Sequence, residues 1–342
     1  FCDSFDHYAS ADIATKWSLR AGSIAIASAK GRAGGGGLNP QENYQYVYKT
    51  LAANYSRLIV GLRVYLENTI EAGFLVYFGD GGSDQCGVKL MADGRVGFYR
   101  AGTLVATSTL ALSTLRFYYL EIAVTFHDSA GAYELRIDGA TWLSASGVDT
   151  TDTANNYASA VWLNGRPGGF GGGGTNTDWV ADDLYICDSS GSRNYDFLGD
   201  VRIDALLPSG NGNSSAFTGS DGNSTDNYAL VDESAPNSDT DYVESSNVSD
   251  VDTYAFPDLS HSPVSIAAVQ ICATAKKSDA GARSLACVTR SNSTDTAGAT
   301  QSLSTSYACM LEVVESDVTA GSPLDWQTAN LNAAQFGVKV AA

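Results

Sequence analysis

The sequence has 342 residues, of which 44% are hydrophobic and 17% are charged, so it can bury a substantial core. Its 38 Asp and Glu against 20 Lys and Arg give a formal net charge of −18. Nucleic acid is excluded as an expected partner, because phosphate binding requires clustered cations. No apolar run approaches the ~18 residues that span a bilayer, and the negative charge disfavours anionic lipid surfaces, so we expect no membrane contact.

Residues 1–190 consist of short runs rich in Tyr, Val and Thr between Gly-rich turns, a pattern typical of β-strands. The expected strands are 23–29, 44–48, 57–66, 74–78, 87–91, 95–100, 116–126, 132–138, 159–163 and 179–187. Asp93-Gly94 and Asp138-Gly139 are hairpin signals. Closely spaced strands of this kind predict a β-sandwich or barrel, with helix limited to a few short turns.

The composition changes near residues 190–200, where we place a domain boundary. Residues 1–195 carry 19 acidic and 14 basic residues, a net charge of −5, whereas 196–342 carry 19 and 6, a net charge of −13. The second part has strand patterns at 197–203, 265–274, 284–289 and 307–314, and 329–338 fits either a short helix or a last strand. The sequence therefore predicts an all-β protein with a larger module at 1–195 and a smaller β-rich module at 196–342.

The cysteines have neither CxxC spacing nor the spacing of a zinc site with His. They are Cys2, Cys86, Cys187, Cys272, Cys287 and Cys309. Buried thiols are the simplest interpretation. If 276–281 is the turn of a symmetric hairpin, Cys272 lies opposite Cys287, close to disulfide reach. Whether that pair is oxidised stays open.

Four local patterns in the first module resemble those of concanavalin A-like, laminin-G-type jelly rolls. They are the opening at 2–8, the strand at 117–122, the Tyr-x-Leu-Arg-Ile-Asp-Gly of 133–139 and the Asp-Asp-Leu-Tyr strand within 182–188. In such folds the first and last strands are adjacent, so the resemblance implies that Cys2 and Cys187 lie on neighbouring strands. Whether Cys2 and Cys187 are oxidised also stays open.

The order of motifs after residue 196 is similar to that of virion structural proteins of tailed bacteriophages. Phe197-Leu198-Gly199-Asp200-Val201-Arg202 is followed by Leu207-Pro208, 231–233, 241–243 and 258–259. This resemblance implies a tail, fibre or capsid-surface component, located in the virion and assembled in the cytoplasm of the host. It implies other virion proteins and further copies of the chain as partners. The charge split of −13 against −5 leads us to expect that 196–342 carries assembly and that 1–195 is displayed.

Enzyme chemistry finds little support in the sequence. Some concanavalin A-like folds are glucanases with Glu-x-Asp-x-Glu on one strand, but here Glu121 is followed by Ala123 and Thr125. There is no Gly-x-Ser-x-Gly elbow, and the Gly-rich run at 169–174 precedes a strand rather than a helix, so it is expected to be a loop. We therefore assign no catalytic residue and expect no enzyme activity.

Metal binding is weakly indicated. Aspartates at short spacings are hard ligands suited to calcium, but no run has the EF-hand spacing, and solvated turn carboxylates are the simpler interpretation. Asp182 and Asp183 are adjacent on an expected strand and should point to opposite faces, so their side chains could not chelate one ion together. Calcium stays open, and we assign neither a cofactor nor a metal ligand.

A glycan site is the functional hypothesis that the residues support. Sugar sites combine aromatic faces with polar groups that bind hydroxyls, on a mostly apolar surface. The candidates that bracket the Gly-rich loop are Trp162, Asn164, Arg166, Phe170 and Trp179. The alternative is that the two tryptophans belong to the core. The stripe formed by Tyr44, Tyr46 and Tyr48 could likewise either contact glycan or belong to the core.

The stretch 204–258 contains 11 acidic residues and no Lys or Arg. It is either a set of solvated loops or a docking surface for a basic partner. The function expected overall is a non-enzymatic structural component of a bacteriophage particle that contacts host-surface glycans. The alternative is a secreted or cell-surface lectin-like module that binds polysaccharide.

Overall fold

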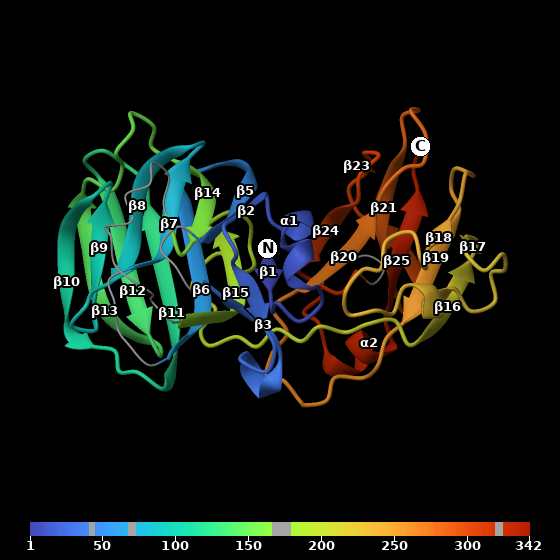
Figure 1. The fold of residues 1–342 in the computed structure, drawn as a ribbon, viewed down its shortest axis with the longest axis horizontal. Helices are drawn as coiled ribbons and strands as arrows, with labels where there is room; N and C mark the ends of the chain where they lie inside the picture. Colours follow the sequence, from blue (N-terminus) through green and yellow to red (C-terminus); the bar gives the residue numbers. More distant parts are fainter. Residues whose placement is uncertain (41–44, 68–72, 166–178, 319–323) are drawn as a thin grey trace. The chain divides into compact units, whose positions relative to one another are not determined.

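The computed structural model describes residues 1–40, 45–67, 73–165, 179–318 and 324–342. Within these ranges the chain forms two compact units (Figure 1). Unit 1 consists of residues 1–6 and 17–203, and unit 2 of residues 7–16 and 204–342. The division therefore falls eight residues after the boundary placed from composition, and a short early segment belongs to unit 2.

Unit 1 contains two antiparallel sheets, with eight and seven strands in the described residues. The eight-stranded sheet has the order β13 (Ala140–Val148), β12 (Gly131–Ile137), β11 (Arg116–Thr125), β6 (Arg57–Leu66), β15 (Trp179–Asp188), β4 (Gly37–Asn39) and β3 (Ala25–Ala27), with β1 (Cys2–Asp3) also paired to β15. The seven-stranded sheet has the order β10 (Thr103–Ala111), β9 (Arg95–Arg100), β8 (Ser83–Leu90), β7 (Gly73–Asp80), β14 (Ala158–Leu163), β5 (Tyr46–Tyr55) and β2 (Leu19–Ala21). A short 3-10 turn, η2, spans Arg32–Gly34.

The two sheets of unit 1 pack face to face around an apolar core (Figure 1). Phe78 of one sheet meets Phe126, which follows the last residue of β11, with ring centroids 5.5 Å apart. Phe98 of β9 stacks on Tyr133 of β12 at 3.9 Å. Period-two alternation explains this arrangement, because one residue in two along each strand faces the partner sheet.

The hairpins predicted from Asp-Gly pairs are confirmed. The turn at Asp93-Gly94 joins β8 to β9, and the turn at Asp138-Gly139 joins β12 to β13. Both glycines have positive φ, which these tight turns require. Cys2 pairs with Tyr185 across β1 and β15, so Cys2 and Cys187 do lie on neighbouring strands.

Unit 2 is also built from antiparallel strands. Its main sheet has six described strands, in the order β16 (Gly210–Ser215), β19 (Val251–Ala255), β25 (Gln335–Val340), β21 (Ser284–Ser291) and β22 (Thr294–Ala297), with β23 (Gln301–Ser302) also paired to β21. Two further pairs are β17 (Thr218–Gly219) with β18 (Val243–Glu244), and β20 (Val269–Ala275) with β24 (Ala308–Val314). The helices are η1 (Ser10–Asp12), α1 (Ile13–Lys16), η4 (Asn227–Leu230) and α2 (Thr328–Ala333).

The hairpin expected to place Cys272 opposite Cys287 is not formed. Cys272 instead forms a disulfide with Cys309, because β20 pairs with β24. Cys287 lies on β21 and opposes Val338 of β25. Strand β21 is buried along most of its length and has neighbours on both sides, which a two-stranded hairpin could not supply.

Two further expectations in the second half need correction. Residues 197–203, expected as a strand, form no strand and instead belong to unit 1 as an irregular segment. Residues 329–338 are not one element, because α2 ends at Ala333 and β25 begins at Gln335. No helix in the described ranges is long and apolar enough to cross a membrane.

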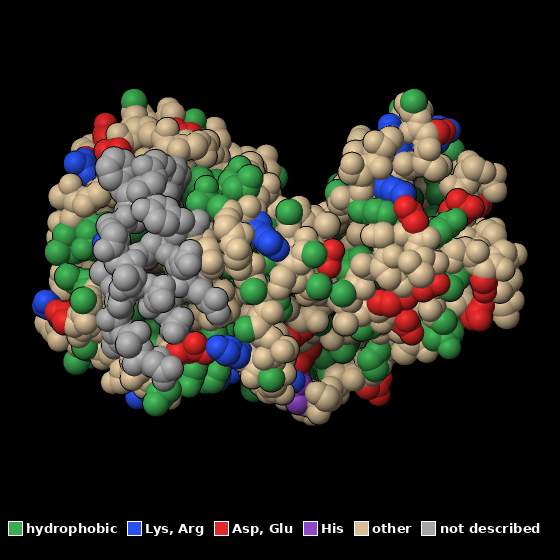
Figure 2. Space-filling model, in the orientation of Figure 1, with side chains coloured by type: hydrophobic (Ala, Val, Ile, Leu, Met, Phe, Trp, Pro, Cys, Tyr) green, Lys and Arg blue, Asp and Glu red, His purple; other side chains and the backbone are tan. Residues whose placement is uncertain are grey.

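Several acidic side chains of 204–258 organise the loops of unit 2. Asp252 is fully buried and accepts hydrogen bonds from the amide of Phe217 (2.8 Å) and from Asn227 (2.6 Å). Asn237 donates to both Glu233 and Asp241. Figure 2 shows further Asp and Glu side chains on the visible face of unit 2. Part of the acidic stretch therefore stabilises irregular backbone that has no sheet partner.

Candidate functional site: an aromatic row on the seven-stranded sheet

One residue from each strand of the seven-stranded sheet lies in a single row across it, directly opposite its neighbours in register. We call this set the aromatic row. Its members are Leu19, Tyr48, Trp162, Tyr77, Gly87, Tyr99 and Leu104. Directly opposed residues of antiparallel strands project on the same side. The row therefore presents aromatic side chains from β5, β14, β7 and β9 on one face.

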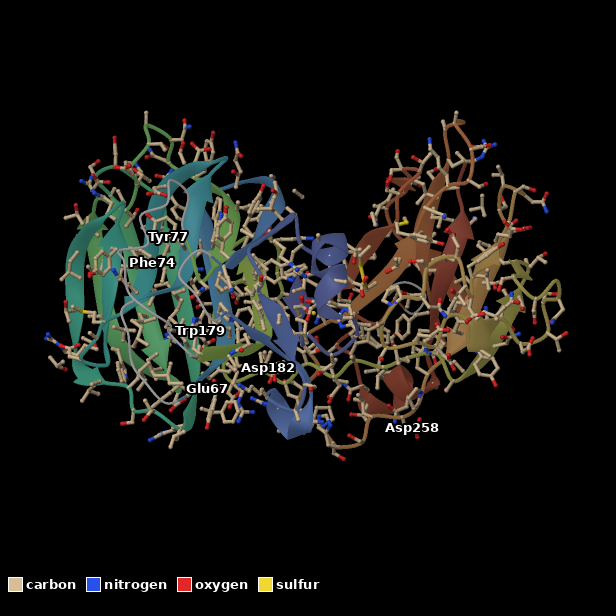
Figure 3. All side chains as sticks on the ribbon, in the orientation of Figure 1. Glu67, Phe74, Tyr77, Trp179, Asp182 and Asp258 are labelled. Atoms are coloured by element: carbon tan, nitrogen blue, oxygen red, sulfur yellow. A yellow bond between two sulfur atoms is a disulfide. The ribbon has the colours of Figure 1, made fainter. Side chains whose placement is uncertain are left out.

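This face is the outer one. Phe78 and Phe98 are the chain neighbours of Tyr77 and Tyr99, and both contact the opposite sheet of unit 1. Consecutive residues of a strand point to opposite faces, so Tyr77 and Tyr99 point away from the core of the sandwich. Figure 3 labels Tyr77 and Phe74 on β7.

Glycines allow the rings to lie close to the sheet. A Cβ atom added at Gly87 would lie 2.2 Å from Cδ2 of Tyr77, and one at Gly79 would lie 2.4 Å from Cζ3 of Trp162. The two rings therefore occupy space that any other residue would fill. Large rings thus alternate with glycines on neighbouring strands, and the aromatic side chains lie close against the sheet.

The aromatic side chains of this face pack on one another. Tyr48 and Trp162 have centroids 5.1 Å apart, and Phe74 makes edge contacts with Tyr77 at 4.9 Å and with Tyr99 at 5.7 Å. Trp162, Tyr77 and Phe74 are buried, whereas Tyr46, Tyr48 and Tyr99 are partly exposed. The buried rings thus pack against tyrosines that are partly exposed to solvent.

Lys89 adds a cation to this layer. It opposes Phe74 of β7 and Gly97 of β9, and its Nζ lies 5.5 Å from the ring centroids of both Phe74 and Tyr99. Partial burial lowers the pKa of Lys89, because the charged ammonium is less well hydrated there. Burial also raises the pKa of Tyr99.

A second cluster of polar groups lies on the eight-stranded sheet of unit 1. A bulge interrupts the pairing of β15 with β6 between Asp182 and Tyr185, and Asp183 has a φ of 48°. Both carboxylates consequently reach Arg32, Asp182 through the Arg32 amide and Asp183 through Nε at 2.7 Å. The expectation that these two side chains point to opposite faces is therefore wrong, because it assumed an uninterrupted strand.

This second cluster holds residues 197–203 against the sheet. The amide of Ile203 donates to Asp183, that of Leu198 to the Tyr185 hydroxyl and that of Gly199 to Glu121. Burial, reinforced by the charge of Asp183, raises the pKa of Asp182 to about 7. Burial also raises the pKa of Asp183 to about 6, against the opposing effects of the Ile203 amide and Arg32. Every oxygen of the two carboxylates is engaged by the chain itself, so the cluster is a structural anchor.

The residues proposed from sequence for glycan contact are buried where the structure describes them. Trp162 is 3% exposed, Asn164 is 4% exposed and Trp179 is fully buried. Trp179 Nε1 donates to Asn164 Oδ1 at 2.9 Å, and Asn164 Nδ2 donates to the carbonyl of Gln45 at 2.6 Å. The polar groups of Asn164 and Trp179 therefore bond within the protein. Of the three described candidates, only Trp162 belongs to the aromatic row. Arg166 and Phe170 lie outside the described residues.

Sequence reasoning missed Phe74, Tyr77, Lys89 and Tyr99. The signal was present in the Asp93-Gly94 hairpin, because a symmetric hairpin about that turn places Gly87 opposite Tyr99 and Lys89 opposite Gly97. What it could not supply was the order of the other strands across the sheet. In the described ranges, no group of three or more His, Cys, Asp or Glu side chains could hold a metal ion.

Comparisons with known proteins give likenesses of fold alone. No family model and no curated protein matches the chain. A solved endo-β-1,4-glucuronan lyase from the fungus Trichoderma reesei is 13% identical with a TM-score of 0.38, covering 50% of this chain and 90% of the lyase. A sialidase of Trypanosoma rangeli is 16% identical with a TM-score of 0.36, covering 48% of this chain and 26% of the sialidase. The chain thus spans about a quarter of that sialidase.

The expectation of a non-enzymatic structural component of a bacteriophage particle is contradicted by these comparisons. The similar solved structures include the lyase and sialidases, a further sialidase being 11% identical over 48% of this chain.

Proposed function

We propose that unit 1 is a concanavalin A-like jelly roll that binds polysaccharide along the aromatic row. The two face-to-face antiparallel sheets and the pairing of β1 with β15 support the jelly-roll assignment, together with the sequence patterns at 133–139 and 182–188. The in-register row of rings supports the binding function and is the observation that carries it.

The chemistry of the row suits a sugar. A pyranose presents C–H groups on its faces and hydroxyls around its edge, so it stacks on a flat aromatic ring while its edge stays hydrogen-bonded. Tyrosine serves both needs, because it offers an apolar ring and a polar hydroxyl. Tyr48 and Tyr99 are partly exposed, at the two ends of the row's aromatic part.

The length of the row favours a polymer over a single sugar. Tyr48 and Tyr99 are separated by four strand-to-strand intervals, from β5 through β14, β7 and β8 to β9. At about 4.8 Å per interval this amounts to roughly 19 Å, enough for several sugar units. A polysaccharide laid across the strands would contact both tyrosines. Trp162 and Tyr77 would support the surface between the two tyrosines.

Binding without cleavage is part of this proposal. Retaining glucanases of the related fold place an acid and a nucleophile about 5–5.5 Å apart on one strand. The corresponding sequence pattern is not present here, since Glu121 is followed by Ala123 and Thr125. We expect the purified chain to release no reducing sugar from the polysaccharides that it binds.

The test is affinity electrophoresis of the full chain through gels that contain soluble neutral or anionic polysaccharides. Tyr48→Ala and Tyr99→Ala should each weaken binding by about three- to tenfold, the loss expected for one stacked ring. Tyr195 is 52% exposed in unit 1 and lies outside the row, so Tyr195→Ala is the matched control.

Urea unfolding of each variant separates binding from folding. Retarded migration of the wild type, lost in the row variants with an unchanged unfolding midpoint, would support the proposal. Migration that is unaffected by every polymer, or equal retardation of wild type and both row variants, would overturn it.

A further inference from the structure

Lys89 has ring contacts but no carboxylate partner in the described part of the chain. Its Nζ lies over the rings of Phe74 and Tyr99. Several other cations of unit 1 are paired with carboxylates, as Arg95 is with Asp93 at 2.7 Å and Arg136 with Glu134 at 2.8 Å. In a chain of net charge −18, a partly buried ammonium would usually pair with a carboxylate, whereas that of Lys89 contacts aromatic rings instead.

The place of Lys89 relates it directly to the aromatic row. Lys89 lies two residues along β8 from Gly87, about 7 Å, and both face the outer side of the sheet. Its Nζ is 5.5 Å from the centroid of Tyr99, the partly exposed ring at one end of the row's aromatic part. An acidic substituent on a sugar stacked on Tyr99 would therefore come within ion-pair distance.

The surroundings of Lys89 would strengthen such a contact. Phe74 and Tyr99 flank the ammonium and shield it from water, and attraction between charges grows as the local dielectric falls. The ring faces hold the ammonium by cation–π attraction, so less side-chain freedom is lost when a ligand binds. The neighbouring position on β9 is Gly97, which leaves the ammonium without a side chain directly opposite on that strand.

From this geometry we infer that the polysaccharide bound by the aromatic row is anionic, with an acidic group that pairs with Lys89. The inference rests on the proposed function and specifies its ligand class. Carboxylate and sulfate groups share the required charge, and the experiment below distinguishes them.

The probes are polygalacturonate, the same polymer with its carboxyl groups methyl-esterified, and a sulfated polysaccharide. Binding of the full chain is measured for each by affinity electrophoresis and calorimetry. Wild type should bind at least one acidic polymer about tenfold more tightly than the esterified one, as expected for one charge-assisted hydrogen bond. This preference should shrink as salt rises, because Lys89 is only partly buried and charges in contact with solvent are screened within about 8 Å at physiological ionic strength.

Lys89→Gln should remove most of that preference, measured as the ratio of the affinities for the acidic and the esterified polymer. The matched control is Lys276→Gln in unit 2, which also removes a lysine that lies over a tyrosine ring, 4.5 Å from the centroid of Tyr307. Lys276 differs in having a carboxylate partner, Asp239. It should leave all binding unchanged.

The outcomes test the anionic ligand and the proposed function separately. Equal affinity of wild type for charged and esterified polymers, with Tyr99→Ala still weakening both, would overturn the anionic ligand and leave the proposed function standing. A charge preference that survives Lys89→Gln would also overturn it. Binding of none of these polymers or of the neutral ones would overturn the proposed function and this inference together.

Discussion

Asp182 and Asp183 lie side by side under the segment 197–203, and their environment governs their charge. Burial is the largest cause that raises the pKa of Asp182 to about 7, and the neighbouring Asp183 adds to it. Amide donors from Arg32 and Asp183 act in the opposite direction. Hydrogen bonds only partly offset the cost of removing a carboxylate from water.

This burial predicts a pH dependence of stability. Because the folded-state pKa of Asp182 lies above the ordinary value of 3.8, the folded state holds the proton more tightly than the unfolded state. The stability that protonated Asp182 contributes is fully present below pH 3.8 and is lost as pH rises through about 7. The urea midpoint of unit 1 should therefore fall between pH 5 and pH 8.

Asp182→Asn should flatten that slope, because the amide does not ionise. Part of the slope should remain, since the pKa of Asp183 is also raised, to about 6. The exposed Asp152 is the control, and Asp152→Asn should keep the wild-type slope. Identical slopes for wild type and Asp182→Asn across this range would contradict the assignment.

At the scale of the strand, the aromatic row depends on which residues meet across the sheet. Gly87 is the member without a side chain, and the Tyr77 ring lies over it. A strand interior normally disfavours glycine, so its presence here is explained by the close approach of a ring.

Gly87→Ala should therefore disturb the row. The added Cβ would lie 2.2 Å from Tyr77 and 2.6 Å from the carbonyl oxygen of Val76, so the ring and backbone must shift. We expect a loss of about 1–3 kcal/mol in the free energy of unfolding, as for overpacked sites, and weaker polysaccharide binding. Chemical unfolding and affinity electrophoresis measure the two effects.

The control for that substitution lies a few residues away. A Cβ at Gly82 would meet nothing within 4 Å, and Gly82→Ala should be nearly neutral. If Gly87→Ala matched Gly82→Ala in stability and in binding, the close packing of Tyr77 on β8 would not matter.

Strand prediction from the sequence succeeded where alternation and turn chemistry agree. The run 57–66 matches β6, and 95–100 matches β9. The segment 197–203 has the apolar content of a strand but packs its Phe197, Leu198 and Val201 against Ile59, Tyr119 and Tyr185 instead. Side-chain pattern alone cannot tell a strand from an extended segment whose backbone amides are bonded by side chains.

At the scale of the whole molecule, the two units should respond differently to reductant. The Cys272–Cys309 disulfide joins β20 to β24 in unit 2 and closes a loop of sequence separation 37. In the chain-entropy account a loop of that size contributes about 4 kcal/mol by restricting the unfolded state. Reduction should therefore lower the unfolding midpoint of unit 2 and leave that of unit 1 unchanged.

Mass spectrometry after thiol alkylation provides the direct measurement. Before reduction Cys272 and Cys309 should be unmodified in the denatured chain, and after reduction both should be alkylated. Cys2→Ser alters a cysteine of unit 1 that is not part of the Cys272–Cys309 disulfide, so it should leave the unit 2 transition unchanged. Alkylation of Cys272 without reductant would contradict the pairing of β20 with β24 through this bond.

Much of the candidate site could not be derived from the sequence. Trp162 was a candidate and does belong to the row, but Asn164 and Trp179 bond to each other and are buried. Tyr48, Trp162, Tyr77 and Tyr99 come from four strands far apart in the chain, and β14 separates β5 from β7 in the sheet. No local pattern specifies that order, because hydrogen bonding between strands is the same whichever strands are adjacent.

The sequence by itself determined the all-β class, the Asp-Gly hairpins and the alternation of 116–126, because backbone preferences and period-two burial act over a few residues. Only the tertiary structure decided that Cys272 bonds to Cys309, that 197–203 is anchored on Asp183 and Glu121, and that four rings and Lys89 share one outer face. These are contacts between distant segments. Their selection depends on how the whole chain buries its apolar surface, which a local window of sequence does not contain.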